Sequence, residues 1–249
     1  MLVLALDTTT RQGSIALARD GALLATYAGD ADTTHGERLP GDLVRVLRAH
    51  ELRVADVDVF AVASGPGSFT GLRIGIATLQ GLALANEKPL AGVSALDALE
   101  DTARMEAGGP TGSAARVEVA SWMDAQRGQV FSAVYSGGEV GEPPLVDRPE
   151  EILARWHREG RRPQVFAGDG ALKYRAAIRA ADPDARVIDP LPPLAPAIAR
   201  LAAARERQHR LVPPDAIRPI YVRRSDAELA RDRRSGQASA ASPALGPTS

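Results

Sequence analysis

The chain has 249 residues, of which 45% are hydrophobic, 24% charged and 4% aromatic, with a formal net charge of −1. This balance is typical of a globular protein with an aliphatic core, and it excludes wholesale disorder and a global attraction to nucleic acid or anionic membranes. The chain has no cysteine, which excludes disulfide scaffolds, cysteine nucleophiles and thiolate metal sites.

The N-terminal apolar run is too short for a signal peptide, and no stretch approaches the roughly 18 apolar residues of a membrane span. We therefore expect a soluble, cytoplasmic protein that has no contact with a membrane.

The first hundred residues alternate strand and helix signals. One helix is indicated by Leu39, Leu43, Val46 and Leu47, spaced i, i+4, i+7 and i+8, and a second over residues 71–86, with Ser68 or Thr70 as its N-cap. A third helix should start at Ser94. Apolar runs and the Asp20-Gly21 hairpin signal predict strands over residues 2–6, 13–18, 22–28, 57–63 and 90–93.

The second half of the chain also alternates strand and helix signals. Residues 106–114 hold three glycines and a proline and are predicted to link an N-terminal lobe (1–105) to a C-terminal lobe (115–234). Residues 235–249 contain only small, polar and a few aliphatic residues, and we expect a disordered tail. Within the second lobe we expect strands over 117–123, 129–135, 164–167 and 217–222. We also expect helices over 149–158 and 196–208, and a further helix that follows the loop 168–170 and ends at residue 181.

The two lobes open alike. A strand ends at Asp7 and another follows Gly13; a strand ends at Asp124 and another follows Gly128. This echo indicates two copies of one α/β unit facing each other, although the pattern is also common in unrelated α/β proteins.

Asp7, Thr8 and Thr9 form the first candidate site, a weak nucleotide-binding site. A carboxylate at the end of a buried strand, followed by hydroxyl groups, can hold a hydrated metal and nucleotide phosphates. The alternative is that Asp7 only caps its own turn. Gly168 and Gly170, in a loop after a later strand, could border an adenosine, but an ordinary turn explains them as well.

The strongest local signal is the stretch Ser64–Gly75, in which Gly65, Gly67, Ser68, Thr70 and Arg73 surround the start of a helix. Backbone N–H groups there could meet a phosphate. A tight turn with close helix packing is the alternative, and the two are compatible.

Other classes of site find little support. No two of the four histidines have the spacing of a zinc ligand pair, no Gly-x-Ser-x-Gly motif is present, and His35 is expected to be exposed or capping. The arginine-rich residues 218–234 could touch RNA or an acidic partner, but a solvated, salt-bridged segment is the commoner explanation.

Five motifs together make the chain resemble the TsaB (YeaZ) family of bacteria over roughly residues 1–230; they are Asp7–Thr10, Ser64–Gly75, Gly92–Leu99, Met123–Val130 and Pro219–Arg223. The resemblance implies an α/β fold with two lobes of the actin-like, sugar-kinase and Hsp70 type. It also implies a role in making N6-threonylcarbamoyladenosine at position 37 of tRNAs that read codons starting with A. In that family TsaB is the partner of the catalytic paralogue TsaD, with the ATPase TsaE as a third component.

Two departures point to a subunit that is not an enzyme on its own. The catalytic paralogue carries two metal-binding histidines where this sequence has Ala95 and Leu99, which cannot donate a lone pair. Thr9 stands where actin-like ATPases have a phosphate-loop glycine. We therefore expect a non-catalytic scaffold with no catalytic residue and no metal, whose contact with tRNA is indirect.

No cofactor is expected, with ATP or ADP at an interface shared with the partner as the open alternative. The competing functions are a stand-alone actin-like ATPase or kinase using Asp7 and Asp124, and a degenerate glycoprotease-type peptidase.

The docking surface is predicted on two apolar helices. Their interface residues are expected to meet an equivalent helix pair on TsaD, or on a second copy when TsaD is absent. These residues are Leu39, Leu43, Val46, Leu72, Gly75, Ile76, Leu79 and Gly81.

Overall fold

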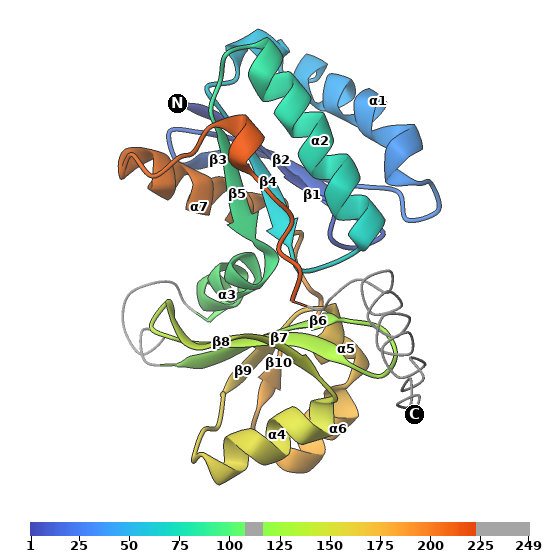
Figure 1. Ribbon diagram of the computed structural model, residues 1–249, viewed down its shortest axis with the longest axis vertical. Coiled ribbons are helices and arrows are strands. Elements are labelled where there is room, and N and C mark those ends of the chain that lie inside the picture. The colour runs from blue at the N-terminus through green and yellow to red at the C-terminus, as the bar shows by residue number, and fades with distance from the viewer. Residues whose placement is uncertain (108–116, 223–249) are drawn as a thin grey trace, which may run out of the picture.

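The protein consists of two lobes stacked along its long axis, each built on a five-stranded sheet (Figure 1). The computed structural model describes residues 1–107 and 117–222. None of the helices in these two ranges combines the length and apolar character that a membrane crossing demands.

The first sheet is formed by five strands from the first hundred residues: β1 (Leu2–Asp7), β2 (Ser14–Arg19), β3 (Ala22–Ala28), β4 (Val59–Gly65) and β5 (Leu90–Ser94). Their order is β3-β2-β1-β4-β5, with β1 antiparallel to β2 and parallel to β4. All residues of β1 and β4 are buried, as expected for strands at the centre of a sheet that is covered on both faces.

Two helices cover each face of this sheet. α1 (His35–Arg48) and α2 (Phe69–Ala85) pack on the side to which Leu4 and Leu6 point. α3 (Ala95–Glu106) and α7 (Ala195–Arg207) pack on the other side, against Val3 and Ala5. Successive side chains of β1 therefore point to opposite faces of the sheet and belong to two different hydrophobic cores.

The helix starts follow from local hydrogen bonds. Ser68 caps α2 by accepting a bond of 3.2 Å from the N–H of Gly71, which confirms Ser68 as the N-cap. Thr34 and Glu37 form a capping box at the start of α1. α1 begins early enough that Pro40 lies in its second turn, and the helix continues through it.

The second sheet repeats the topology of the first. Its strands are β6 (Glu118–Asp124), β7 (Val130–Ser136), β8 (Glu139–Asp147), β9 (Val165–Ala167) and β10 (Arg186–Val187). The order β8-β7-β6-β9-β10 matches β3-β2-β1-β4-β5 strand for strand, with the same parallel and antiparallel neighbours around the central strand. The two halves are thus copies of one unit, and Asp7 and Asp124 each end a central strand.

The outer face of the second sheet is covered by α4 (Pro149–Arg158), α5 (Asp169–Lys173) and α6 (Arg175–Ala181). Three aromatic rings, Trp122, Trp156 and Phe166, lie within 5.2 to 6.3 Å of one another in this core. Most of the few aromatic residues that are fully buried are therefore concentrated here.

Two strands and one loop differ from the sequence-based expectation. β8 and β10 were not expected, and β8 contains Pro143 and Pro144, which normally argue against a strand. β8 is an edge strand, where missing N–H groups cost little. Residues 217–222 are not a strand; they contact the first sheet through one bond of 2.7 Å, from the N–H of Ile220 to the carbonyl of Ser64.

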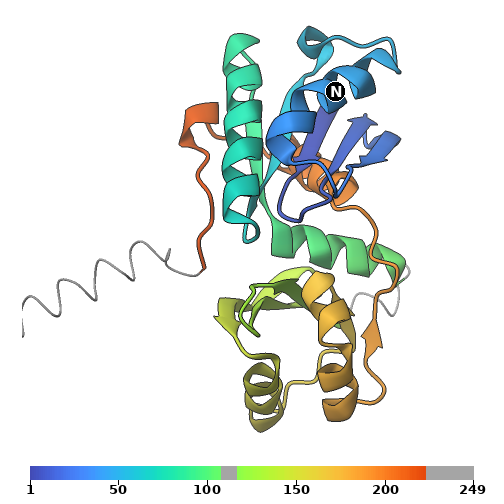
Figure 2. The same ribbon diagram turned by 90° about the vertical axis from the view of Figure 1, so that its right-hand side faces the viewer.

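The chain also returns to the first lobe near its C-terminal end. α7 and the short helix η3 (Pro214–Ala216) pack on the first lobe, although the sequence analysis assigns residues 115–234 to the second (Figure 2). The N–H of Ala195 donates to the Ser14 hydroxyl at 3.1 Å and fixes the start of α7 there. The predicted linker begins at Glu106, the last residue of α3; its residues 108–114 and the predicted tail 235–249 lie outside the described residues.

Most residues expected at the partner interface are buried within the first lobe instead. Of the eight, Gly81 is exposed; the buried ones are Leu39, Leu43, Val46, Leu72, Gly75, Ile76 and Leu79. Their apolar stripe is the side of each helix that packs on its own sheet, so these seven do not form the exposed face that the sequence analysis expects, and their role at a partner interface stays a prediction. The side of α2 that faces outward carries Arg73, Ala77, Gly81, Leu84 and Ala85.

A matched pair of glycine substitutions tests this orientation of α2. A Cβ at Gly75 would lie 2.3 Å from the Thr8 hydroxyl, whereas a Cβ at Gly81 meets nothing within 4 Å. Gly81→Ala should raise the free energy of unfolding by about 0.5–1 kcal/mol through helix propensity. Gly75→Ala should lower it by about 1–3 kcal/mol through overpacking. Urea denaturation measures both, and equal effects would contradict the orientation.

Candidate functional site

A cleft of about 1160 Å³ lies between the lobes and receives residues from both. The first lobe contributes Thr9, Thr10 and the start of α2, and the second lobe contributes Asp124 and Asp169. The cleft is of a size that could hold a small molecule.

The candidate residues Asp7, Thr8 and Thr9 lie at the edge of the cleft but beneath its surface. Their exposed fractions are 3%, 0% and 3%. One carboxylate oxygen of Asp7 accepts two bonds from Thr9, from its N–H at 2.8 Å and its hydroxyl at 2.6 Å. Burial raises the pKa of Asp7, although the two bonds from Thr9 act in the opposite direction. Asp7 thus holds its own turn, which is the structural alternative considered from the sequence.

The glycines of the Ser64–Gly75 motif bring α2 onto this turn. A Cβ at Gly67 would lie 2.6 Å from Thr9, and a Cβ at Gly71 would lie 2.1 Å from the carbonyl oxygen of Thr8. The helix start therefore lies directly against this turn, and only glycine fits at these two positions. Ser68, Thr70 and Arg73 are exposed at the same helix start, and all three line the cleft.

Gly168 and Gly170 serve packing in the same way. A Cβ at Gly168 would lie 2.0 Å from the carbonyl oxygen of Trp122, and a Cβ at Gly170 would lie 2.8 Å from the backbone of Met123. Close approach of α5 to β6 explains both glycines. Gly65 is explained likewise, because its Cβ would lie 2.8 Å from the carbonyl of Ile220.

The second lobe places two carboxylates on the cleft. Asp124 accepts a salt bridge of 2.8 Å from Lys173. Asp169 accepts bonds from the N–H groups of Asp124 and Gly170, at 3.0 and 2.9 Å. Burial raises the pKa of Asp169. Arg11, Arg73 and Arg127 also line the cleft, so its lining carries charges of both signs.

His35 was missed as a connecting residue, because it was expected to be exposed or capping. It is buried, and its two ring nitrogens lie 2.8 Å from the carbonyl of Thr10 and 2.9 Å from the guanidinium of Arg38. Since a guanidinium only donates and a carbonyl only accepts, the ring is a neutral tautomer protonated on Nε2. The guanidinium of Arg38 also forms a salt bridge of 2.7 Å with Asp42. These polar groups therefore connect the cleft turn to the middle of α1.

The positions of the absent histidine pair lie at the junction of the lobes. Ala95 and Leu99 are 0% and 1% exposed and belong to a core that includes residues of both sheets. Asp97, between them, accepts from the hydroxyl of Tyr135 at 2.8 Å and lies 3.5 Å from Arg205. Across residues 1–107 and 117–222, no three His, Cys, Asp or Glu side chains are grouped as a metal site would require.

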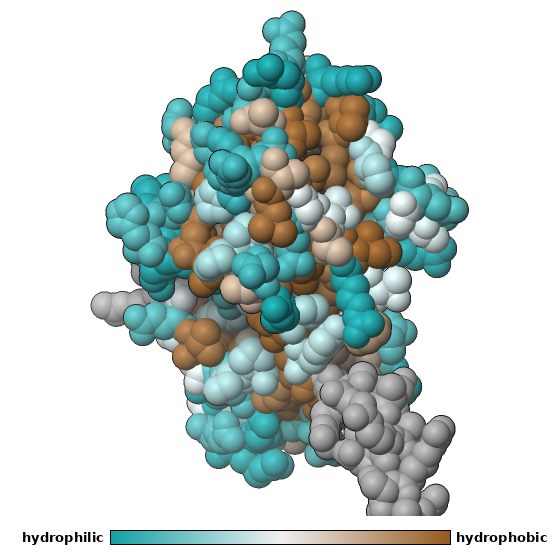
Figure 3. Space-filling view, turned by 45° about the horizontal axis from the view of Figure 1, so that its top comes forward, coloured by the Kyte–Doolittle hydropathy of each residue, from teal (hydrophilic) through white to brown (hydrophobic). Residues whose placement is uncertain are grey.

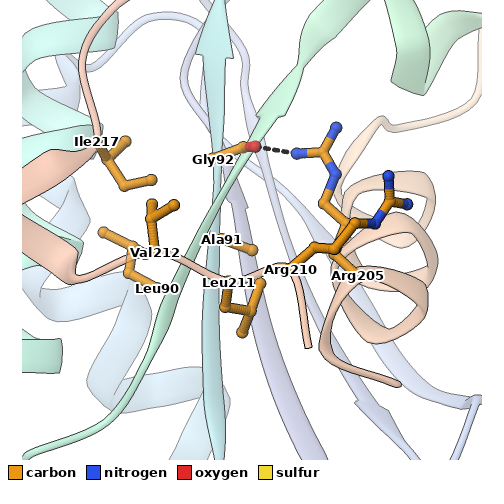
Figure 4. Close-up of a pocket in the computed structure, with 8 residues that line it drawn as sticks. All are labelled: Leu90, Ala91, Gly92, Arg205, Arg210, Leu211, Val212 and Ile217. Carbon is orange, nitrogen blue, oxygen red and sulfur yellow. Dashed lines mark hydrogen bonds between the residues drawn. The ribbon is translucent and has the colours of Figure 1, made fainter. Parts of the chain in front are cut away.

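A second, smaller pocket of about 350 Å³ lies along the edge strand β5 (Figure 4). Arg205 donates to the carbonyl of Gly92 and pairs with Asp97, so its guanidinium is engaged by the fold. Leu90 bridges to Val212 across the same edge. This hollow is therefore the gap left where the returning chain covers an open sheet edge.

Apolar side chains also reach the surface of the first lobe among hydrophilic ones (Figure 3). Leu84 is 55% exposed on α2 and Val44 is 44% exposed on α1. The small residues Ala77 and Gly81 lie in the same outward row of α2 as Leu84. Such a row lets another helix approach closely.

Comparison with known proteins gives consistent matches. The family model described as "TsaD: tRNA N6-adenosine threonylcarbamoyltransferase" matches residues 28–230. The tRNA threonylcarbamoyladenosine biosynthesis protein TsaB of Escherichia coli is 36% identical over 160 residues, which is 62% of this chain and 66% of that protein. The crystallised YeaZ from Pseudomonas aeruginosa has a TM-score of 0.72 at 28% identity, over 88% of this chain and 99% of that chain.

A more distant likeness concerns the fold alone. A ROK family protein from Streptococcus pneumoniae has a TM-score of 0.50 at 8% identity, over 84% of this chain and 100% of that chain. Together with the repeated sheet topology, this likeness confirms the two-lobed actin-like fold.

The burial of Asp7 predicts a pH-dependent effect of Asp7→Asn. A carboxyl group whose pKa is raised by folding contributes stability below its unfolded pKa, and that contribution is lost as the pH rises through the folded pKa. The amide keeps an oxygen for the two bonds from Thr9 and carries no charge. The variant should therefore melt above the wild type at pH 7, with a difference that shrinks toward about pH 4. Calorimetry across this range tests it, and a variant that melts below the wild type at pH 7 would contradict it.

Proposed function

Because the chain belongs to the TsaB (YeaZ) family, we propose that it is the non-catalytic subunit needed for N6-threonylcarbamoylation of adenosine 37 in tRNAs that read codons starting with A. It acts by binding the catalytic subunit TsaD, which works with the ATPase TsaE. Its own contact with tRNA is indirect, and its place of action is the cytoplasm.

The observation that carries this proposal is the burial of Ala95 and Leu99. The resemblance assigns to these positions the two metal-binding histidines of the catalytic paralogue. Here both side chains are apolar and fill the core between the lobes. A protein without these ligands needs another subunit to supply the metal chemistry.

The cleft supports a scaffold over a stand-alone ATPase or kinase. The carboxylate of Asp7 is engaged by Thr9, and the start of α2 lies against the turn where phosphates would bind. Nucleotide at an interface shared with TsaD remains compatible with this arrangement. Equilibrium dialysis of the isolated chain with ATP separates the two functions: tight ATP binding and turnover would favour the enzyme.

The outward row of α2 supports a helix-to-helix contact with TsaD. The row pairs the small residues Ala77 and Gly81 with the exposed Leu84, and α1 lies beside it. The family model that matches residues 28–230 is described as TsaD, which supports the proposal that a TsaD subunit offers an equivalent helix pair. The same face could join two copies of this chain when TsaD is absent, and the two uses would compete.

Gly81→Arg should abolish copurification with TsaD while circular dichroism and melting temperature stay close to those of the wild type. The new side chain has open space around it, so the loss would come from blocked helix approach. Val140→Arg is the matched control, because Val140 is 56% exposed on β8 of the other lobe. Full-yield copurification of Gly81→Arg would contradict this docking face. In an assay of tRNA threonylcarbamoylation that contains TsaD and TsaE, omission of this chain should prevent tRNA modification.

A further inference from the structure

We propose that the docking surface continues from α2 onto the C-terminal segment, and that the partner subunit packs against Tyr221. The segment, residues 213–222, is termed the strap, and Phe69, Arg73 and Tyr221 are termed the strap cluster. The inference rests on the proposed function, because it names a further part of the same protein–protein interface.

The strap is attached along the length of α2. The side-chain amide of Gln80 donates to the carbonyls of Pro214 and Ile217, at 2.8 and 3.1 Å. The side chain of Ile217 is buried in the core shared by α2 and β4. A further bond, from the N–H of Ile220 to the carbonyl of Ser64, holds the strap where it reaches the cleft. The backbone of the strap is therefore fixed both beside α2 and next to Tyr221.

Tyr221 is held in place although nearly half of it is exposed. Its hydroxyl accepts a bond of 3.2 Å from Nε of Arg73, and its ring lies 5.5 Å from that of Phe69. The guanidinium of Arg73 lies 3.9 Å from the centre of the Phe69 ring. Tyr221 is 47% exposed and Phe69 is 44% exposed. The strap cluster therefore presents an aromatic side chain in one fixed orientation.

Folding alone gives a weak reason for this arrangement, because half-exposed rings gain only part of the free energy of burial. Binding gives a stronger one. Aromatic residues and arginine are the residue types enriched at the centres of protein interfaces. A side chain already immobilised in the free protein loses less conformational entropy when a partner covers it.

The position and charge of the strap cluster favour a protein partner. Arg73 belongs both to this cluster and to the outward row of α2, so the two surfaces are continuous. α2 has no acidic residue, and a complementary surface would offer an apolar side chain to Tyr221 and a carboxylate to Arg73. The occupant that fits is the TsaD subunit that we propose to bind α2.

The test measures the Kd of purified TsaD for the full chain and its variants by calorimetry. Tyr221→Ala should weaken binding by about tenfold or more, as for an aromatic hot spot. Tyr221→Phe keeps the ring and should stay within about threefold of the wild type. Val140→Ala, a truncation of another exposed apolar residue in the second lobe, should not change the Kd.

Unchanged binding of Tyr221→Ala, with binding abolished in Gly81→Arg, would overturn this inference and leave the proposed function intact. Absence of any binding by the wild type would instead overturn the proposed function. A variant that keeps TsaD affinity but loses tRNA affinity would overturn the inference in favour of an RNA contact. If Tyr221→Ala does not fold, Arg73→Glu replaces it, since Arg73 is exposed; the same tenfold loss is expected, and an unchanged Kd overturns the inference.

Discussion

The contact between the start of α2 and the turn after β1 determines most of what this protein can do. Three glycines, Gly67, Gly71 and Gly75, allow the helix to lie directly on Thr8 and Thr9. Within the described residues, the same contact turns Arg73, Ala77, Gly81 and Leu84 outward. One packing arrangement thus positions the turn after β1 and an exposed face of α2.

The junction between the lobes is also closely packed. α3 packs against both sheets, and Ala95, Leu99 and alanines of α7 belong to one core that runs through both lobes. Alanine-rich packing brings helix and sheets close together and leaves no room for imidazole ligands. Part of the region between the two lobes is therefore filled by internal packing.

The parts of the fold that the sequence predicts well are those governed by local pattern. The apolar runs of β1, β4 and β6, the Ser68 cap and the echo between Asp7 and Asp124 all correspond to observed features. β8 was not predictable by the same rules, since Pro143 and Pro144 are tolerated only because the strand lies at a sheet edge.

The candidate site was less predictable, because its interactions are non-local. An apolar stripe shows that a helix packs, but not whether its stripe meets its own sheet or a partner, so the outward face of α2 could not be identified from the sequence. The bond between Arg73 and Tyr221 joins residues 148 positions apart, and no spacing rule connects them. The packing role of Gly168 likewise depends on Trp122, which lies on a different element.

The return of the chain to the first lobe has a consequence for biosynthesis. β1 to β5 are made first, but one face of their sheet is completed only by α7, and Ile217 completes the core under α2. During synthesis, part of the apolar surface of the N-terminal sheet therefore stays uncovered until α7 and Ile217 have been translated. The second lobe, enclosed between these two parts of the sequence, can form its aromatic core before the first lobe is complete.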